Sequence, residues 1–253
     1  MSLESVAKVV GSTPYMKPGQ AEIITKLIRE HGLADVLELG IMHGVSTCYL
    51  ADTVRDLGRG HVTSLDLDLS RDNLPNAETL LSQLHLSDLV TIRRDPTSYV
   101  WTLMKMLDED PTPRFDLCYL DGAHDWFNDG FAFFLVDKLL RPGGWLVLDD
   151  LGWSFATSPA LAATEKVQQM PIDQRESQQV RQVYDLLVKT HPAYDEFKVI
   201  DDWGFARKRL EGSVGGPARI VREVIVKRER YGFGALMREA AVKGRKVIWR
   251  HGK

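Results

Sequence analysis

Residues 35–46 read DVLELGIMHGVS, a short apolar run that ends in a glycine and is followed by a second glycine four residues later. The run Asp35 to Leu39 has the length of a buried strand, and Ser46 to about Leu57 has the apolar pattern of a helix. Gly40 lets the chain turn sharply, and Gly44 permits a close approach where the helix starts. Ser46 is expected to cap that helix. The stretch therefore predicts a strand, a glycine loop and a helix, the unit from which α/β folds are built.

The same alternation of strands and helices continues along the chain. It predicts an α/β fold with a doubly wound, mostly parallel sheet of seven strands and an antiparallel hairpin at one edge, because alternating elements cover a parallel sheet on both faces. The predicted strands are 35–39, 61–67, 89–93, 115–120, 145–148, 196–200 and 204–208. The predicted helices are 3–10, 20–31, 46–57, 76–84, 99–107, 126–140 and 178–190.

Length and charge suggest how the chain is organised. With 253 residues and 44% hydrophobic content, it can bury one sizeable core. Residues 1–206 carry 18 Lys and Arg against 31 Asp and Glu, whereas residues 207–253 carry 14 against 4. We predict N-terminal helices over 1–33, the α/β domain over 34–210 with a lid at 151–177, and a basic helical extension over 211–253.

Cysteine usage and the N-terminus bear on the compartment. Cys48 and Cys118 both lie among apolar residues, so we expect buried, reduced thiols. The first residues have no basic region followed by an apolar run, so no signal peptide is expected. No stretch approaches the roughly 20 apolar residues that span a bilayer. These features predict a soluble, cytoplasmic protein without a membrane span.

The interior of the glycine loop distinguishes between cofactors. A dinucleotide site requires G-x-G-x-x-G, because the middle glycine brings backbone N–H groups onto the pyrophosphate. Residues 41–43 are Ile, Met and His instead, which disfavours a nicotinamide oxidoreductase. Glu38 would repel a pyrophosphate, but it suits the ammonium group of a methionine moiety. On the loop alone, an ordinary glycine turn with no ligand stays open.

Acidic residues after the next two strands support a cofactor site. Asp66 lies at the end of 61–67, where a carboxylate can accept hydrogen bonds from both ribose hydroxyls. Asp68 is the alternative, although it can equally cap the following segment. Asp95, after the strand 89–93, is in the right place to contact an adenine edge; it can also simply start a helix.

Three carboxylates and a histidine follow the strands 115–120 and 145–148. Asp121, Asp149 and Asp150 are expected to converge at the carboxyl ends of these neighbouring strands and to repel one another unless a cation is bound. All-oxygen ligation favours Mg²⁺, Ca²⁺ or Mn²⁺. His124 is three residues past Asp121 and is a candidate general base. The alternative is that the acids cap helices and that the histidine is structural.

These motifs together resemble the class I S-adenosylmethionine methyltransferases, and more narrowly the metal-dependent O-methyltransferases that include catechol and sugar methylating enzymes. The resemblance covers about residues 30–210 and implies a Rossmann-like fold with S-adenosylmethionine and Mg²⁺ or Mn²⁺ as cofactors. In that branch, an Asp after the fourth strand and an acidic pair after the fifth bind the metal, which correspond here to Asp121, Asp149 and Asp150. A lysine is the base in the catechol enzymes, and His124 stands in its position. The motifs that carry the resemblance are ELG at 38–40, GVS at 44–46, Asp66, LDGAH at 120–124, RPGG at 141–144 and LDD at 148–150.

We therefore predict that the acceptor is a small molecule or an oligosaccharide with a hydroxyl group. A sugar, polysaccharide or glycosylated natural product is favoured, because apolar residues that would hold a planar catechol are not evident. Trp153 and the lid are expected to close over the acceptor, and His43 can face it. A small aromatic acceptor and a non-catalytic S-adenosylmethionine-binding module are the alternatives. The acidic body disfavours nucleic acid as a partner. The amphipathic, basic extension suggests packing on the body or on a second subunit of a homodimer.

Overall fold

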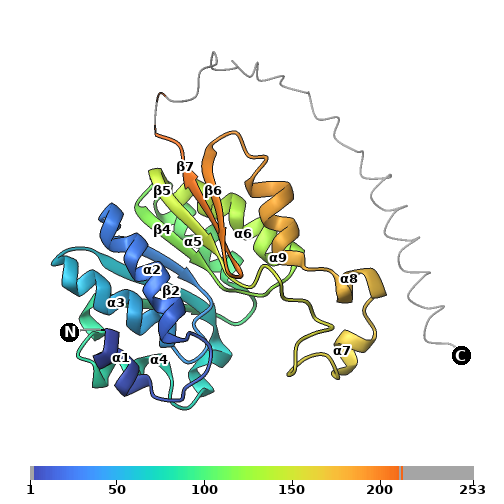
Figure 1. Ribbon diagram of the computed structural model, residues 1–253, viewed down its shortest axis with the longest axis horizontal. Helices are drawn as coiled ribbons and strands as arrows, with labels where there is room; N and C mark the ends of the chain where they lie inside the picture. Colours follow the sequence, from blue (N-terminus) through green and yellow to red (C-terminus); the bar gives the residue numbers. More distant parts are fainter. Residues whose placement is uncertain (1–2, 211, 213–253) are drawn as a thin grey trace, which may run out of the picture. The chain divides into compact units, whose positions relative to one another are not determined.

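The computed structural model describes residues 3–210 and 212, and the basic extension predicted over 211–253 therefore lies, apart from Gly212, outside the described residues. Figure 1 shows a central sheet with helices on both faces. The helices are α1 Leu3–Val10, α2 Pro18–His31, α3 Val45–Leu57, η1 Asp68–Asp72, α4 Ala77–Gln83, η2 Ser87–Leu89, α5 Tyr99–Glu109, α6 Trp126–Leu139, α7 Glu165–Gln168, α8 Ile172–Glu176, α9 Gln179–Gln182 and η3 Val183–Val188. The strands are β1 Asp35–Leu39, β2 His61–Leu67, β3 Val90–Asp95, β4 Phe115–Leu120, β5 Leu140–Leu148, β6 Tyr194–Ile200 and β7 Trp203–Lys208.

The seven strands form one sheet in the order β3-β2-β1-β4-β5-β7-β6. The first five are parallel, whereas β7 is antiparallel to both β5 and β6. The predicted α/β, doubly wound sheet with an antiparallel edge hairpin is confirmed. Because the order reverses between β1 and β4, their carboxyl ends border the crevice where open sheets of this kind bind ligands.

Each face of the sheet has its own hydrophobic core. On one face, α1 to α4 pack with side chains such as Val36, Val62 and Val147. On the other face, α5, α6 and the segment from α9 through η3 pack with the alternate strand residues, such as Leu37 and Leu146. The N-terminal helices thus share a core with the sheet. Among the described helices, none is long and apolar enough to cross a membrane.

Two elements differ from their predicted form. The predicted strand 145–148 is preceded by residues 140–144, which belong to the same strand, and a register irregularity against β4 accommodates Pro142 to Gly144. The predicted helix 178–190 is two helices, because the α-helical turn α9 continues as the π-helix η3 from Val183. Cys48 and Cys118 are both buried free thiols, as expected.

Candidate active site

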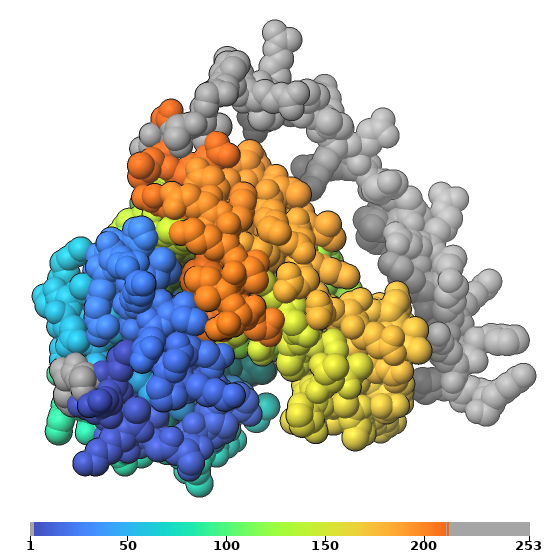
Figure 2. Space-filling view, viewed as in Figure 1, coloured from blue at the N-terminus to red at the C-terminus, as the bar shows by residue number. Residues whose placement is uncertain are grey.

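A cleft of about 440 Å³ opens at the carboxyl ends of β1, β4 and β5. Figure 2 shows the surface hollowed between the blue N-terminal segment and the yellow segment that follows β5. The glycine loop forms one wall and the loops after β4 and β5 form the floor. The cleft is lined by Pro14, Tyr15, Met16, Gln20, Gly40, Ile41, Met42, His43, Val45, Ser46, Asp121, Gly122, Ala123, His124, Asp149, Asp150, Trp153, Ser158, Ala160 and Leu161.

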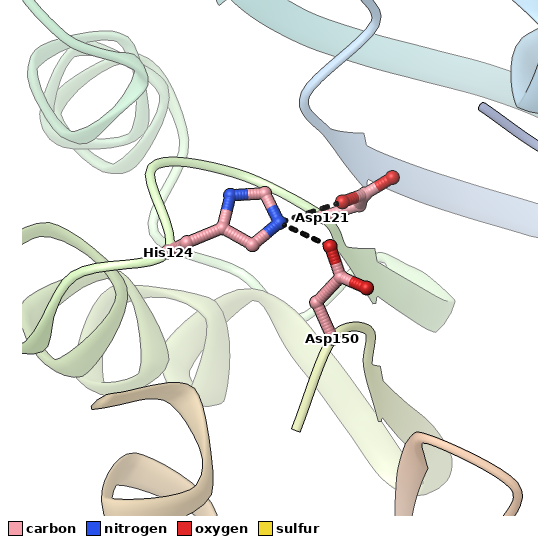
Figure 3. Close-up of side chains that lie close together, drawn as sticks. All are labelled: Asp121, His124 and Asp150. Atoms are coloured by element: carbon pink, nitrogen blue, oxygen red, sulfur yellow. Dashed lines mark hydrogen bonds and ion pairs between the residues drawn. The ribbon is translucent and has the colours of Figure 1, made fainter. Parts of the chain in front are cut away.

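His124 lies between two carboxylates in this cleft. Figure 3 shows its imidazole directed at both acids. Its Nε2 is 2.9 Å from Oδ2 of Asp150 and 3.3 Å from Oδ1 of Asp121. One ligand atom from each of the three residues lies within 4.8 Å of the others, a spacing that could hold a metal ion. The ring of Trp153 is 4.9 Å from the imidazole. Strand ends distant in sequence thus bring together a histidine, two acids and an aromatic ring.

The two acids make His124 more basic. Burial alone would disfavour the imidazolium, but the hydrogen bonds to Asp121 and Asp150 outweigh it and raise the pKa of His124 to about 11. In the absence of a cation the imidazolium therefore neutralises the carboxylates. A bound cation would reverse this effect, because it would take over the compensating charge and favour the neutral ring.

Asp149 is directed differently from its neighbour. Its Oδ2 accepts a hydrogen bond of 2.5 Å from the Tyr119 hydroxyl, which is also 3.3 Å from Oδ2 of Asp121. Asp149 is only 8% exposed, although it lines the cleft. Burial and the charge of Asp121 raise the pKa of Asp149. The structure thus gathers Asp121, His124 and Asp150 in one cluster, and Asp149 borders it through Tyr119.

Glu38 lies in the interior, not in the cleft. Its carboxylate accepts hydrogen bonds from the hydroxyls of Ser46 at 2.5 Å, Ser64 at 2.6 Å and Thr47 at 2.7 Å. Burial raises the pKa of Glu38 to about 7 despite these bonds. The expected capping role of Ser46 is wrong, because α3 begins at Val45 with Gly44 as its cap and no side chain caps it. Ser46 instead lines the cleft and donates its hydroxyl to Glu38.

Asp66 is tied to the glycine loop. Its Oδ2 accepts hydrogen bonds from the backbone N–H groups of Ile41 at 2.8 Å and Met42 at 2.9 Å, and its Oδ1 accepts one from Leu67. A carboxylate has about four acceptor positions, so Asp66 can hold the loop and still accept a bond from a hydroxyl group. Its ribose role stays a prediction.

Asp95 organises the start of α5. It accepts hydrogen bonds from the hydroxyl and the backbone N–H of Thr97 and from Nζ of Lys105. These bonds, those from Thr97 first, hold the pKa of Asp95 well below its usual range. Asp95 is 3% exposed and does not line the cleft. Its predicted contact with an adenine edge therefore also stays a prediction.

The two glycines of the loop lie too close to neighbouring protein atoms for a side chain to fit. Gly40 has φ +94°, and a Cβ there would lie 1.8 Å from the carbonyl oxygen of Asp121. Gly44 has φ +87°, and a Cβ there would lie 2.5 Å from the Cβ of Ala77. A side chain at either position would push the loop away from β4 or from α4, so both glycines set the shape of the cleft wall.

Several cleft residues were not predicted from the sequence. The cleft is also lined by Pro14, Tyr15, Met16 and Gln20, which precede the sheet. Their sequence carries no motif that points there. The ring of Tyr15 stacks on that of His43 at 6.0 Å. A role for Tyr119 beside the acids could have been predicted, because residues two apart in a strand lie on the same side and Asp121 is a candidate metal ligand.

The backbone around the cleft is unusual. Seven non-glycine residues in the described part of the chain have positive φ, and four of them line the cleft. This left-handed conformation costs about 1–3 kcal/mol at each such residue, and it persists only where the surroundings enforce it. The four residues are Tyr15, Met42, His124 and Asp150.

Comparison with known proteins agrees with this geometry. A family model described as a methyltransferase domain matches residues 37–151, from β1 to just past β5. The O-methyltransferase hkm8 of Aspergillus hancockii is 30% identical over 115 residues, which are 46% of this chain and 42% of the fungal protein. The chain thus aligns with less than half the length of that relative.

Solved structures share the fold over most of the chain. An O-methyltransferase from Bacillus cereus in complex with SAH is 22% identical with a TM-score of 0.57, covering 82% of this chain and 90% of that one. The O-methyltransferase TomG of Streptomyces achromogenes, involved in tomaymycin synthesis and solved with SAM, is 19% identical with a TM-score of 0.58, covering 82% and 89%. The chain is therefore similar to methyltransferases: residues 37–151 match a methyltransferase domain, and the fold is shared with solved O-methyltransferases.

Proposed function

We propose that this protein is an S-adenosylmethionine-dependent O-methyltransferase that uses a divalent cation. The convergence of Asp121, His124 and Asp150 beside the glycine loop carries the proposal, because a base and acidic ligands then meet in one cleft. A methyltransferase domain alone is compatible with many acceptor atoms. A histidine between carboxylates suits a hydroxyl acceptor, whose proton has to be removed as the C–O bond forms.

The cofactor is assigned to the glycine loop. S-Adenosylmethionine supplies an electrophilic methyl group on a sulfonium centre. Gly40, Gly44 and Ser46 would shape its methionine side, Asp66 would accept from the ribose, and Asp121 would border the methyl group. Glu38 would act indirectly, through the hydroxyl of Ser46, and Asp95 through the shape of the loop before α5. This assignment is supported by the position of the loop at the switch in strand order.

The donor set fits a cation. Asp121 and Asp150 offer carboxylate oxygens within the cluster, and Asp149 offers a further carboxylate beside it. Hard cations such as Mg²⁺ or Mn²⁺ prefer oxygen ligands of this kind. When bound, the cation would lower the pKa of an acceptor hydroxyl and orient it. We assign the site to Asp121, Asp149 and Asp150.

His124 is the proposed base. It lies in the cleft with Nε2 directed at the two acids, so a hydroxyl oriented by a cation on those acids would come within its reach. The neutral ring would accept the hydroxyl proton at Nε2 as the oxygen attacks the methyl group. Asp121 and Asp150 would then stabilise the imidazolium. Orientation contributes most, since the sulfonium methyl is already activated.

The acceptor is proposed to be a sugar or a glycosylated molecule. Trp153 supports this, because its ring lies beside His124 and an aromatic face can pack against the C–H groups of a sugar. A small aromatic acceptor is the second candidate. It is favoured by Tyr15, Met42 and Leu161, which line the cleft and are 61%, 45% and 40% exposed.

The test is transfer of a labelled methyl group from S-adenosylmethionine to a panel of sugars and catechols, with Mg²⁺ or Mn²⁺ present. A labelled methyl ether is expected with the wild-type chain, and far less with His124→Ala at equal cofactor binding. Tight binding of S-adenosylhomocysteine without transfer to any acceptor would instead indicate a binding module.

We also propose that the chain forms a homodimer. Phe127 and Phe131, one turn apart on α6, are 73% and 55% exposed. Exposed apolar surface of this kind often marks a contact between subunits. Light scattering on the full chain should give twice the monomer mass of 28.6 kDa; a monomer at micromolar concentration would contradict the dimer.

A further inference from the structure

The turn that carries His124 lies against a buried tyrosine and a buried aspartate. Tyr99 is the first residue of α5 and Asp129 lies in α6. They are 5% and 0% exposed, and the Tyr99 hydroxyl donates a short hydrogen bond to Oδ1 of Asp129. Neither residue lines the cleft, so the proposed chemistry does not use them directly.

This pair binds the backbone on both sides of His124. The N–H of Ala123 donates to the Tyr99 hydroxyl oxygen at 3.1 Å and to Oδ1 of Asp129 at 3.3 Å. The N–H of Asp125 donates to Oδ2 of Asp129 at 3.1 Å. The residues immediately before and after the histidine are therefore held by the same two side chains.

The turn needs such support, because His124 has φ +57°. The left-handed region is disfavoured for a residue with a side chain, and it persists where surrounding contacts enforce it. The turn also lies directly against the phenol ring, since a Cβ on Gly122 would be 2.6 Å from the Tyr99 hydroxyl oxygen. The Tyr99 ring and the hydrogen bonds thus both hold the turn formed by residues 122–125.

We propose that Tyr99 and Asp129 are positioning residues for His124, fixing the turn so that Nε2 faces Asp121 and Asp150. The inference rests on the proposed function, in which His124 is the base. The pair acts through backbone amides and lies outside the lining of the cleft. Loss of the Tyr99 hydroxyl should let the turn relax away from the left-handed conformation and move the imidazole out of line.

The experiment is a double-mutant cycle with Tyr99→Phe, which keeps the ring, and His124→Ala. One lost hydrogen bond corresponds to about a tenfold effect. We expect kcat of Tyr99→Phe to fall about tenfold while the Kd for S-adenosylhomocysteine is unchanged. In the His124→Ala background, Tyr99→Phe should have no further effect, because the group it positions is absent.

Tyr49→Phe is the matched control. Tyr49 is a buried tyrosine of α3 whose hydroxyl has no hydrogen-bond partner among the described residues. It should show wild-type kcat in both backgrounds. Asp129→Asn provides a second variant if Tyr99→Phe does not fold. Its amide N–H₂ group would face the N–H of Asp125, so that two donors meet and the hydrogen bond is lost. The kcat of this variant should fall in the same way.

A readout without turnover separates this inference from the proposed function. In NMR spectra of chain with ¹⁵N-labelled histidine, the ring signal that disappears in His124→Ala should shift in Tyr99→Phe and stay in place in Tyr49→Phe. An unshifted signal, or an equal loss of kcat with and without His124, would overturn the positioning role. If no acceptor is methylated, the proposed function fails while the histidine signal still decides the positioning role.

Discussion

Glu38 and Asp66 are carboxylates on neighbouring parallel strands, and their surroundings give them different properties. Glu38 is 0% exposed and receives three hydroxyl hydrogen bonds. Asp66 is partly exposed and receives backbone N–H groups of the glycine loop. Burial raises the pKa of Glu38 inside the domain, whereas Asp66 lies at the carboxyl end of its strand, where it holds the glycine loop.

Glu38 should make stability depend on pH. Burial raises its pKa from 4.5 to about 7, so between these values the unfolded chain releases the proton while the folded chain keeps it. The folded state then binds more protons, and the free energy of unfolding falls as the pH rises from about 4.5 to about 7, by up to about 3 kcal/mol. Glu38→Gln cannot ionise. In urea unfolding its pH profile should be flatter by that amount, and parallel profiles would contradict the assignment.

Asp66→Ala should weaken binding of S-adenosylhomocysteine. The substitution removes the proposed ribose acceptor and the anchor of the loop amides at Ile41 and Met42. Hydrogen bonds to a charged group contribute about 1.5–3 kcal/mol, which corresponds to an increase in Kd of roughly 10- to 150-fold by calorimetry. Asp68→Ala, in the segment just after β2, is the control and should bind normally. An unaltered Kd in Asp66→Ala would move the ribose role elsewhere.

At the scale of elements, the turn before α6 depends on a helix cap. Oδ1 of Asp125 accepts the N–H of Asn128 at 2.7 Å, and Oδ2 accepts the Asn128 amide at 2.8 Å. Asp125→Ala should therefore lower the free energy of unfolding by about 1 kcal/mol in urea denaturation. Asp125→Asn, which can still cap, should stay within a few tenths of the wild-type value. Equal losses in the two variants would show that the cap contributes little.

The elements with clear local signals were predictable. The strands 61–67 and 115–120 and the helix 3–10 have the predicted bounds, because each is an apolar run or stripe limited by Gly or Pro, or by a polar segment. The strand that begins at Leu140 was predicted too short, since Pro142 to Gly144 have the sequence of a turn. The π-helix from Val183 has no local signal, because its apolar spacing also fits an α-helix.

The site was predictable only in part, for a similar reason. Asp121, His124 and Asp150 could be brought together because parallel strands end at one edge of a sheet. The direction of a side chain at that edge is set by its neighbours. Glu38 lies inward because three hydroxyl groups surround its carboxylate, and one of them comes from β2. Such contacts depend on tertiary packing and leave no periodic pattern in the sequence.

At the scale of the whole molecule, the cleft joins segments from three regions of the chain: residues 14–20, the loops of the sheet, and residues 153–161. A ligand bound there would contact all three and stabilise the folded state over the unfolded one. Ligand binding adds about 2.7 kcal/mol when the free ligand is at 100 times its Kd.

Addition of Mg²⁺ or Mn²⁺ should accordingly raise the Tm of the wild-type chain, and EDTA should reverse the rise. Asp150→Ala should abolish the shift, because it removes one carboxylate and leaves His124 to neutralise Asp121 alone. Asp173→Ala, in α8 and away from the cleft residues, is the control and should retain the shift. Methyl transfer at full rate in EDTA would contradict the proposed requirement for a divalent cation.

The left-handed residues at the cleft have a consequence for protein engineering. Replacement of Tyr15 or Met42 by glycine would relieve a disfavoured backbone conformation, so a screen for thermal stability could select such variants. The same replacements would remove the side chains that form the mouth of the cleft. We expect stabilised variants to bind the acceptor less well, so that heat resistance and turnover would have to be selected together in this chain.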